Sequence, residues 1–315
     1  MIPTAEPDVQ EGIEYWNTQP ASLDGVLGGY GTGSLPRVDA LGSRLFLLNL
    51  YPQLSTIPSA FRPLDTPLDP PRKRALDVGA GIGRVTADVL LHLVSDVTIL
   101  EPVDSFVQEA LSRARASASA VVASSSNGAW PGLADGSKSV TILQGTLQDF
   151  HPLFPHRAHF LDRVGYQSPR PADEIGLGFD VIWCQWCLGH LSDPDLVAFL
   201  KRSHESLKKH PKSLIVVKEN LCPDAEDGSA VKVFDEQDSS LTRSDMAWKS
   251  AFKQAGLRLI REQVQEGLPE GLFVVKMCVN VSSCLIRHAE GVQIGTVYGE
   301  GLKRAQQPNA FGEEW

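Results

Sequence analysis

The sequence lacks any apolar run that approaches the ~20 residues needed for a transmembrane helix. Its first residues, MIPTAEPDVQEG, have neither the basic start nor the apolar stretch of a secretory signal peptide. These absences predict an intracellular protein, placed in the cytoplasm with the nucleus as a second compartment, and they predict no membrane partner.

Cysteine is scarce, with five residues in a chain of 315, and this odd number favours reduced thiols over a disulfide framework. Cys184 and Cys187 have the C-x-x-C spacing, but they fall in FDVIWCQWCLGH, an apolar stretch with strand character. Positions three apart on a strand point to opposite faces, and no second Cys or His pair completes four ligands. We therefore expect two buried thiols and no metal site.

Positive charge is in deficit, because 29 lysine and arginine residues face 38 aspartate and glutamate residues. The formal net charge is −9 and the sequence pI is about 5.4. Nucleic-acid binding needs a basic face, so this balance predicts no nucleic-acid partner and favours small or cationic ligands. A hydrophobic content of 42% is ordinary for a globular protein with its own core.

Strand-like and helix-like segments alternate along most of the chain. Strands are predicted at 74–79, 96–102, 139–145, 179–186, 213–220, 257–265 and 271–281, and helices at 9–17, 37–51, 83–94, 104–116, 194–209 and 244–256. This order is typical of an α/β protein with a mostly parallel, seven-stranded, Rossmann-like sheet and helices on both faces. The last two strands have only a short linker and are expected to pair antiparallel. Insertions without clear periodicity stand at 115–138 and 151–178.

The chain divides into three predicted parts. Residues 1–70 form a helical N-terminal segment that covers the substrate site, residues 71–284 form the ligand-binding α/β domain, and residues 285–315 form a loosely ordered tail. The tail is assigned because its apolar residues have no period.

A glycine loop follows the first strand of the α/β domain. LDVGAGIGR carries Gly79, Gly81 and Gly83 between a predicted strand and a predicted helix, and Glu101 closes the next strand. Glycines let the backbone approach a ligand closely, a helix start offers free N–H groups, and a terminal carboxylate accepts both hydroxyls of a ribose. This combination is similar to the nucleoside-binding half of the S-adenosylmethionine-dependent methyltransferases.

Five segments together resemble one family of these enzymes, the protein N-terminal (alpha-amino) methyltransferases. They are YWNTQPASLDGVLGGYG, LDVGAGIGRVT, GTLQDF, IWCQWCLGHLSD and VVKENL with FDEQDSSLTRS. The resemblance implies a class I methyltransferase fold, the cofactor S-adenosyl-L-methionine, and methylation of the free α-amino group of proteins that begin X-Pro-Lys after methionine removal. It extends the expected partners to ribosomal proteins.

The resemblance also implies roles for individual residues. The cofactor would be bound by Gly79, Gly81, Arg84, Glu101, Leu147, Gln148 and Gln185. The substrate would be bound by Trp16, Leu27, Tyr30, Trp186, His190, Asn220, Asp235 and Asp238. Catalysis would rest on Asp238 with His190 as the base, the two not separated, and on Asn220 to orient the amine.

Two departures from the family pattern leave alternatives open. Phe273 stands where the family has a tyrosine that holds the substrate, and the tail beyond about residue 284 has no recognised counterpart. Glu101 stands where the family usually has aspartate, but both carboxylates suit a ribose. The rival interpretations are a methyltransferase with another small-molecule or protein target and a methyltransferase-like adaptor without activity.

Overall fold

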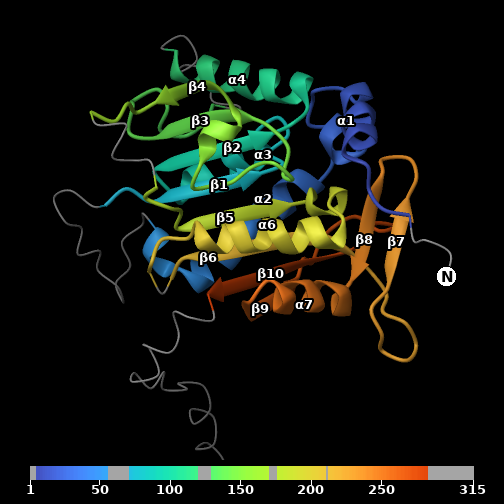
Figure 1. Cartoon of the computed structure of the whole chain (residues 1–315). Coiled ribbons are helices and arrows are strands. Elements are labelled where there is room, and N and C mark those ends of the chain that lie inside the picture. The colour runs from blue at the N-terminus through green and yellow to red at the C-terminus, as the bar shows by residue number, and fades with distance from the viewer. Residues whose placement is uncertain (1–4, 56–70, 120–128, 170–175, 211, 283–315) are drawn as a thin grey trace, which may run out of the picture.

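The computed structural model describes residues 5–55, 71–119, 129–169, 176–210 and 212–282 (Figure 1). Its centre is a ten-stranded sheet whose main path runs β4-β3-β2-β1-β5-β6-β10-β9, with β8 beside β6 and β7 beside β8. The strands are β1 Arg74–Val78, β2 Asp96–Glu101, β3 Ser139–Gln144, β4 His159–Gly165, β5 Val181–Gln185, β6 Leu214–Cys222, β7 Lys232–Asp235, β8 Ser240–Ser244, β9 Leu257–Val264 and β10 Val274–Ser282.

The middle of the sheet is parallel, as the alternating sequence predicts. Strand β1 pairs with β2 and β5, β2 pairs with β3, and β5 pairs with β6, all in parallel. The carboxyl ends of these strands therefore meet at one edge of the sheet. Strand β10 lies antiparallel between β6 and β9, which confirms the predicted pairing of the last two strands.

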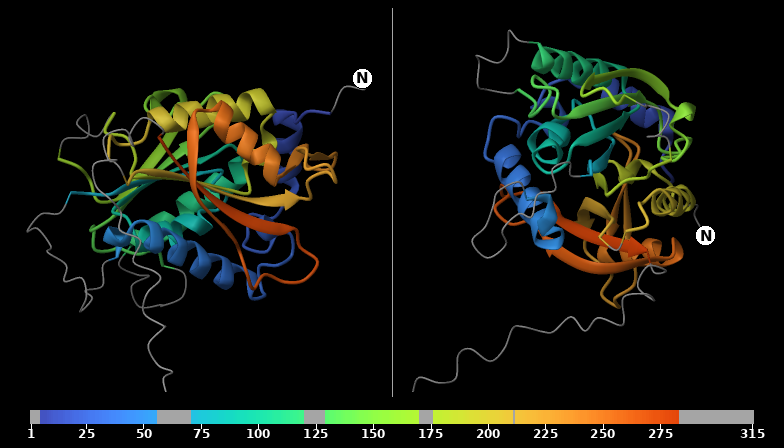
Figure 2. Two further views of the ribbon diagram at one scale, coloured as in Figure 1. Left: turned by 90° about the horizontal axis from the view of Figure 1, so that it is seen from below. Right: turned by 90° about the vertical axis from the view of Figure 1, so that its left-hand side faces the viewer.

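Helices cover both faces of the sheet, so that each face has its own apolar core (Figure 2). The helices are α1 Val9–Thr18, α2 Leu35–Leu50, α3 Arg84–Asp88, α4 Asp104–Ala118, α6 Asp193–Glu205 and α7 Asp245–Gln254. Phe46 and Leu47 of α2 belong to one core, and Phe199 of α6 and Phe252 of α7 belong to the other. Helix α1 begins at Val9 because the Asp8 carboxylate accepts hydrogen bonds from the N–H groups of Gln10 and Glu11.

Within the described residues, the structure has ten strands where the sequence predicts seven. Strand β4 lies within the predicted insertion 151–178 and pairs antiparallel with β3 at the edge of the sheet. Most of its residues are at least partly exposed, Phe160 among them, so the sequence lacks the apolar pattern by which a buried strand is recognised. Strands β7 and β8 form a hairpin of four and five residues around charged sequence, which carries little strand signal.

The helix predicted at 83–94 is shorter than expected. Helix α3 ends at Asp88, and a 3-10 turn, η3 Leu90–His92, follows it. Val89 leaves helical geometry, and Leu90 and Leu91 enter the core. The tail 285–315 and residues 120–128 of the insertion 115–138 lie outside the described residues. The division of the chain at residues 70 and 284 stays a prediction.

The packing of α2 against the sheet gives a matched stability test. Leu47 is fully buried, whereas Leu45 on the same helix is 53% exposed. We expect Leu47→Ala to lower the free energy of unfolding by about 2–5 kcal/mol, because it leaves a cavity in the core. Leu45→Ala should change it by about 0.5 kcal/mol or less. Urea unfolding followed by circular dichroism measures both, and equal effects would mean that α2 does not pack as described.

Candidate functional site

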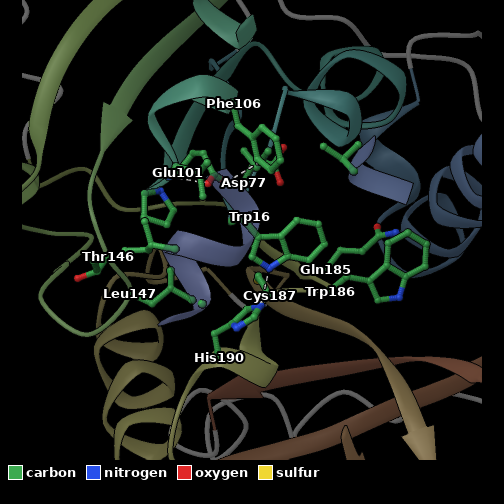
Figure 3. A pocket seen from close by; sticks show the side chains of 18 of the residues that line it. Trp16, Asp77, Glu101, Phe106, Thr146, Leu147, Gln185, Trp186, Cys187 and His190 are labelled. Atoms are coloured by element: carbon green, nitrogen blue, oxygen red, sulfur yellow. Dashed lines mark hydrogen bonds between the residues drawn. The ribbon is translucent and has the colours of Figure 1, made fainter. Parts of the chain in front are cut away.

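Two adjoining pockets open at the carboxyl edge of the parallel strands. The first, the glycine-loop pocket, is seen from close by in Figure 3. Its lining includes Gly12 and Trp16 of α1, Asp77, Gly79, Gly81 and Arg84 of the first strand–helix unit, Glu101 at the end of β2, Phe106, Leu147 and Gln148, Gln185 at the end of β5, and Trp186 and His190 after it. The second, the acidic pocket, is lined among others by Leu27, Tyr30, Glu219, Asn220, Asp238, Ser240, Trp248 and Phe273.

The glycine loop needs its glycines for two different reasons. Gly79 has φ +61°, and a Cβ atom there would overlap the Cys187 side chain. Gly81 has φ +56° and faces open space, with Val26 Cγ1 as the nearest atom at 3.7 Å from a Cβ placed there. Gly79 therefore allows a close approach within the protein, whereas Gly81 leaves room in the pocket for a ligand.

Two buried carboxyl groups face the glycine-loop pocket. Glu101 accepts hydrogen bonds from the N–H groups of Gly81 (2.7 Å) and Val103 (2.9 Å), and burial raises its pKa to about 7. Asp77 accepts a bond from Thr86 Oγ1 (2.6 Å), and burial raises its pKa to about 6. As carboxylates, these groups suit the hydroxyl and ammonium donors that a nucleoside-linked amino acid carries.

Arg84 and Gln185 are held by a carboxylate that the sequence did not single out. Asp39 of α2 is fully buried, and its oxygens accept from Arg84 Nη1 at 2.6 Å and from Gln185 Nε2 at 2.9 and 3.0 Å. Lys218 Nζ of β6 lies 2.5 Å from the other Asp39 oxygen. Arg84 also lines the pocket, where its guanidinium suits the carboxylate of a ligand.

The loop after β3 forms the opposite wall of the glycine-loop pocket. Arg202 of α6 fixes this loop, because its guanidinium donates to the carbonyl oxygens of Leu147 (2.9 Å), Gln148 (3.1 Å) and Phe150 (3.0 Å). The Gln148 side chain donates to the His190 carbonyl oxygen at 3.2 Å. The apolar Leu147 and the polar Gln148 are thus presented together to a ligand with a flat, partly polar ring.

The two pockets share a wall made of Trp16, Val26, Trp186 and His190. Three buried polar atoms at or beside it have no hydrogen-bond partner among the described residues: Trp186 Nε1, His190 Nδ1 and Asp238 Oδ1. Buried polar atoms are normally paired, so these three mark a place where a polar ligand belongs. The residues that line the acidic pocket include the carboxylates Glu219 and Asp238 but no lysine or arginine, which fits a cationic ligand.

The turn after β5 places the wall. Trp186 has φ +53°, a left-handed conformation that costs a non-glycine residue about 1–2 kcal/mol. Its N–H donates to the Lys218 carbonyl oxygen at 3.1 Å. Glu219 Oε1 accepts from the N–H groups of Cys187 and Leu188, both at 3.0 Å, and burial raises the pKa of Glu219 to about 7. These bonds from β6 hold the strained turn in place.

The structure brings nearly all the predicted site residues to these pockets. The seven residues expected to hold the cofactor all line the glycine-loop pocket, and Leu27, Tyr30, Asn220 and Asp238 line the acidic one. Asp235 lines neither pocket; it ends β7 exposed, and its carboxylate accepts from the Gln237 N–H. Phe273 is 53% exposed at the mouth of the acidic pocket. The individual roles stay predictions.

Sequence reasoning missed the buried charges behind the site, although a signal was present. Asp39 and Ser43 fall on the same buried stripe of α2 as Leu35, Phe46 and Leu47. Lys218 and Glu219 follow four apolar residues inside one strand. A charged residue at an apolar position implies a buried partner, but the pattern does not say which residue that partner is.

No group of three or more His, Cys, Asp or Glu side chains that could hold a metal ion occurs within the described residues. Cys184 and Cys187 are buried free thiols, and burial raises the pKa of each well above its usual range. Among the helices in the described part of the chain, none is long and apolar enough to cross a membrane.

Comparison with known proteins agrees with the geometry. A family model described as AdoMet dependent proline di-methyltransferase matches residues 5–153 and 155–280. The alpha N-terminal protein methyltransferase 1 of Schizosaccharomyces pombe is 34% identical over 267 residues, which is 85% of this chain and 93% of that protein. The N-terminal Xaa-Pro-Lys N-methyltransferase 1 of Xenopus tropicalis is 32% identical over 262 residues, which is 83% of this chain and 90% of that protein.

Solved structures show the same architecture. A SAM-dependent methyltransferase from Leishmania major superposes with a TM-score of 0.58 at 29% identity, covering 86% of this chain and 82% of that one. The sheet order, the glycine loop and the carboxylate that ends β2 define the protein as a class I methyltransferase that uses S-adenosyl-L-methionine. Within that class, the chain belongs to the family of AdoMet dependent proline di-methyltransferases.

The two kinds of positive-φ glycine give a test of the cofactor pocket. Gly81→Val puts a branched side chain into the pocket, and we expect the affinity for S-adenosylhomocysteine to fall at least tenfold, which is about 1.4 kcal/mol. Gly136→Val is the matched control, because Gly136 has φ +64° and no atom within 4 Å of its Cβ position. It should lose about 1–2 kcal/mol of stability and keep its affinity. Titration calorimetry measures both, and unchanged affinity in Gly81→Val would contradict the assignment.

The raised pKa of Glu101 predicts a pH dependence of cofactor binding. Ribose hydroxyls donate to the ionised carboxylate, so protonation below about pH 7 opposes binding. The affinity for S-adenosylhomocysteine should be level above pH 7 and fall, by about tenfold per unit at most for one group, below it. Glu101→Gln should bind more weakly and keep only a shallower fall near pH 6, where Asp77 titrates. A flat profile in the unaltered protein between pH 5.5 and 8 would exclude the assigned role.

Proposed function

We propose that this protein transfers methyl groups to the free α-amino group of proteins whose mature sequence begins X-Pro-Lys. Two relatives that match over most of their length are named as N-terminal protein methyltransferases, and one of these names specifies Xaa-Pro-Lys. The observation that carries the proposal is the shared wall, because it places a cofactor pocket directly against an acidic pocket that lacks cations.

The geometry assigns a task to each side of the wall. The bound cofactor supplies a methyl group on a positively charged sulfur, so no metal or covalent enzyme intermediate is needed. Trp16 and Trp186 line both pockets, where their rings would help to exclude water from the bound reactants. Asn220 follows the buried stretch of β6 and orients the substrate from the acidic side. Most of the rate enhancement would therefore come from positioning.

The substrate amine must lose a proton before it can attack. An N-terminal ammonium has a pKa near 7.7–8.0, so its deprotonation at neutral pH costs only about 1 kcal/mol. Asp238 Oδ1 lies buried beside the wall without a partner, which suits the acceptance of that proton. The Asp238 carboxylate also attracts the ammonium form and brings it to the wall.

A transfer assay separates this function from its rivals. We expect radiolabelled methyl transfer to an X-Pro-Lys peptide with a free N-terminus and none to the same peptide with an acetylated N-terminus, because acetylation removes the nucleophile. Transfer to both peptides would mean that the lysine side chain is the target. Cofactor binding without transfer to either would favour an adaptor or a different substrate.

The β7–β8 hairpin, called the acidic hairpin below, carries Asp235 at the end of β7 and Asp238 in the turn. These two carboxylates predict selectivity at the third substrate residue. Burial raises the pKa of Tyr15 of α1, and the negative charges of Asp238 and Asp235 add to this effect. A hydrogen-bonded charge pair that is desolvated on binding is worth about 1.5–3 kcal/mol, or roughly 10- to 150-fold in kcat/KM, whereas a pair with a carboxylate that stays exposed, as Asp235 is here, is worth only about 0.2–1 kcal/mol. If the bound peptide covers Asp235, peptides with Lys or Arg at position three should exceed Ala by at least tenfold.

Two conservative variants test the carboxylates separately. Asp235→Asn should narrow the preference for Lys mainly through KM, whereas Asp238→Asn should lower kcat by about 100-fold or more. Initial rates on peptides with Lys, Arg, Ala or Glu at position three measure both effects. Equal rates on the Lys and Ala peptides with the unaltered enzyme would exclude the hairpin as a specificity element.

The proposal extends to the class of protein and the compartment. Ribosomal proteins are abundant, basic and synthesised in the cytoplasm, and their cationic N-termini fit an acidic pocket. We therefore propose ribosomal proteins as substrates, in the cytoplasm and also in the nucleus. Mass spectrometry of the N-termini of ribosomal proteins in cells with and without this enzyme tests that extension.

A further inference from the structure

A hydrogen bond joins the end of α1 to the turn after β5. The indole Nε1–H of Trp16 donates to Nε2 of His190 at 3.0 Å, with the two rings nearly perpendicular at 84° (Figure 3). The two residues are 174 positions apart in the chain, and both belong to the wall between the pockets. The bond therefore lies where the methyl group must pass.

This bond determines which nitrogen of His190 carries the proton. An indole N–H only donates, so the nitrogen that accepts from it must present a lone pair. A neutral imidazole has one protonated and one unprotonated nitrogen. Because Nε2 of His190 is the acceptor, its neutral ring has the proton on Nδ1.

The other side of the ring faces the hairpin that carries Asp238. A Cβ atom placed on Gly12 would lie 3.1 Å from His190 Nδ1 and 3.4 Å from the Asp238 carbonyl oxygen, so the three residues are close together. His190 Nδ1 and Asp238 Oδ1 are both buried and lack a partner among the described residues. One is an N–H donor and the other an acceptor, and both belong to the lining of the acidic pocket.

The surroundings keep His190 neutral. Burial lowers the pKa of His190, and the Asp238 carboxylate and the Ser239 backbone only partly oppose this effect. Other ionisable groups on the elements packed here include Tyr15 of α1, whose pKa is raised by burial and by Asp238, and Glu219 of β6, whose carboxyl group accepts bonds from the turn that precedes His190. Arg243 of β8 also packs against this turn, and its guanidinium donates to the carbonyl oxygens of Leu188 and Leu191 and to the Asp193 carboxylate.

We propose that Trp16 is a positioning residue that fixes His190 as a neutral Nδ1–H donor, and that Asp238 alone accepts the proton of the substrate amine. Nε2 is occupied by the indole and Nδ1 already carries its proton, so the ring has no free basic site. This inference rests on the proposed function for its catalytic part, but the state of His190 can be measured without a substrate.

The proposed step balances in atoms and charge. The substrate ammonium gives one proton to an Asp238 oxygen and becomes a neutral amine with a lone pair. The amine nitrogen then bonds to the methyl carbon as the carbon–sulfur bond breaks and its electron pair stays on sulfur. The positive charge thereby moves from sulfur to the methylated nitrogen, and the proton on Asp238 leaves to solvent. His190 keeps its own proton throughout.

The first test is long-range ¹⁵N–¹H NMR of the full chain labelled in histidine, with the cofactor product S-adenosylhomocysteine bound and no peptide present. We expect the His190 ring, identified by the loss of its signals in His190→Asn, to show a protonated Nδ1 and an unprotonated Nε2 at pH 7.5. In Trp16→Phe, which keeps a ring but loses the N–H, the proton should move to Nε2 in most molecules, and the ring should titrate at a higher pH.

The unaltered protein decides the question even if Trp16→Phe does not fold. A protonated Nε2 on His190 in its spectrum would overturn the proposal, as would an unchanged tautomer in a folded Trp16→Phe. Because neither result depends on methyl transfer, failure of the proposed function in the peptide assay would leave this measurement intact.

The second test compares two matched variants with an X-Pro-Lys peptide. Asparagine offers an amide N–H close to the position of imidazole Nδ1–H but no basic nitrogen, so His190→Asn should lose about tenfold or less in kcat. Asp238→Asn removes the proton acceptor and should lose about 100-fold or more. Equal losses, or a larger loss in His190→Asn, would assign the proton to His190 and overturn the proposal.

Discussion

The buried carboxylate of Asp39 is the interaction on which the site depends. Burial acts to raise the pKa of Asp39, but Arg84 and Lys218 outweigh it and hold that pKa below its usual value. The same carboxylate accepts from Gln185, so one side chain on α2 fixes residues from α3, β5 and β6. Removal of such a group leaves buried cations unpaired, which typically costs 3–5 kcal/mol. Asp39 thus couples the placement of α2 to the shape of the cofactor pocket.

That coupling explains why residues far apart in the sequence form one site. Arg84 extends from Asp39 to the pocket, and its guanidinium carbon lies 5.4 Å from the centre of the Trp186 ring in a cation–π contact. Trp186 and Trp16 then form the wall with His190. Helix α1 reaches this wall independently, through its Asp8 cap, whose N–H donates to Ser239 Oγ at 2.9 Å on the acidic hairpin. The N-terminal helices therefore belong to the site as well as covering it.

The sequence predicts the parts of this arrangement that local patterns encode. The parallel strands, the glycine loop and Glu101 follow from apolar runs and turn chemistry within a few residues of one another. The edge strand β4 and the β7–β8 hairpin escape prediction because half-exposed, charged segments acquire strand geometry only by pairing with a neighbour. The sequence also does not predict which residues pair with Asp39. Arg84 is 45 positions away and Lys218 is 179 positions away, and no periodicity in the sequence identifies contacts over such separations.

Three consecutive residues of β6 show how little sequence the site needs once the sheet is in place. Side chains alternate along a strand, so Lys218 and Asn220 share one face and Glu219 has the other. Lys218 forms an ion pair with Asp39, and Asn220 lines the acidic pocket. Glu219 accepts hydrogen bonds from the N–H groups of the turn after β5. The carbonyl of Lys218 also accepts from Trp186, which offsets part of the cost of its left-handed backbone. A one-residue shift of β6 would exchange these faces, and cofactor and substrate residues would be displaced together.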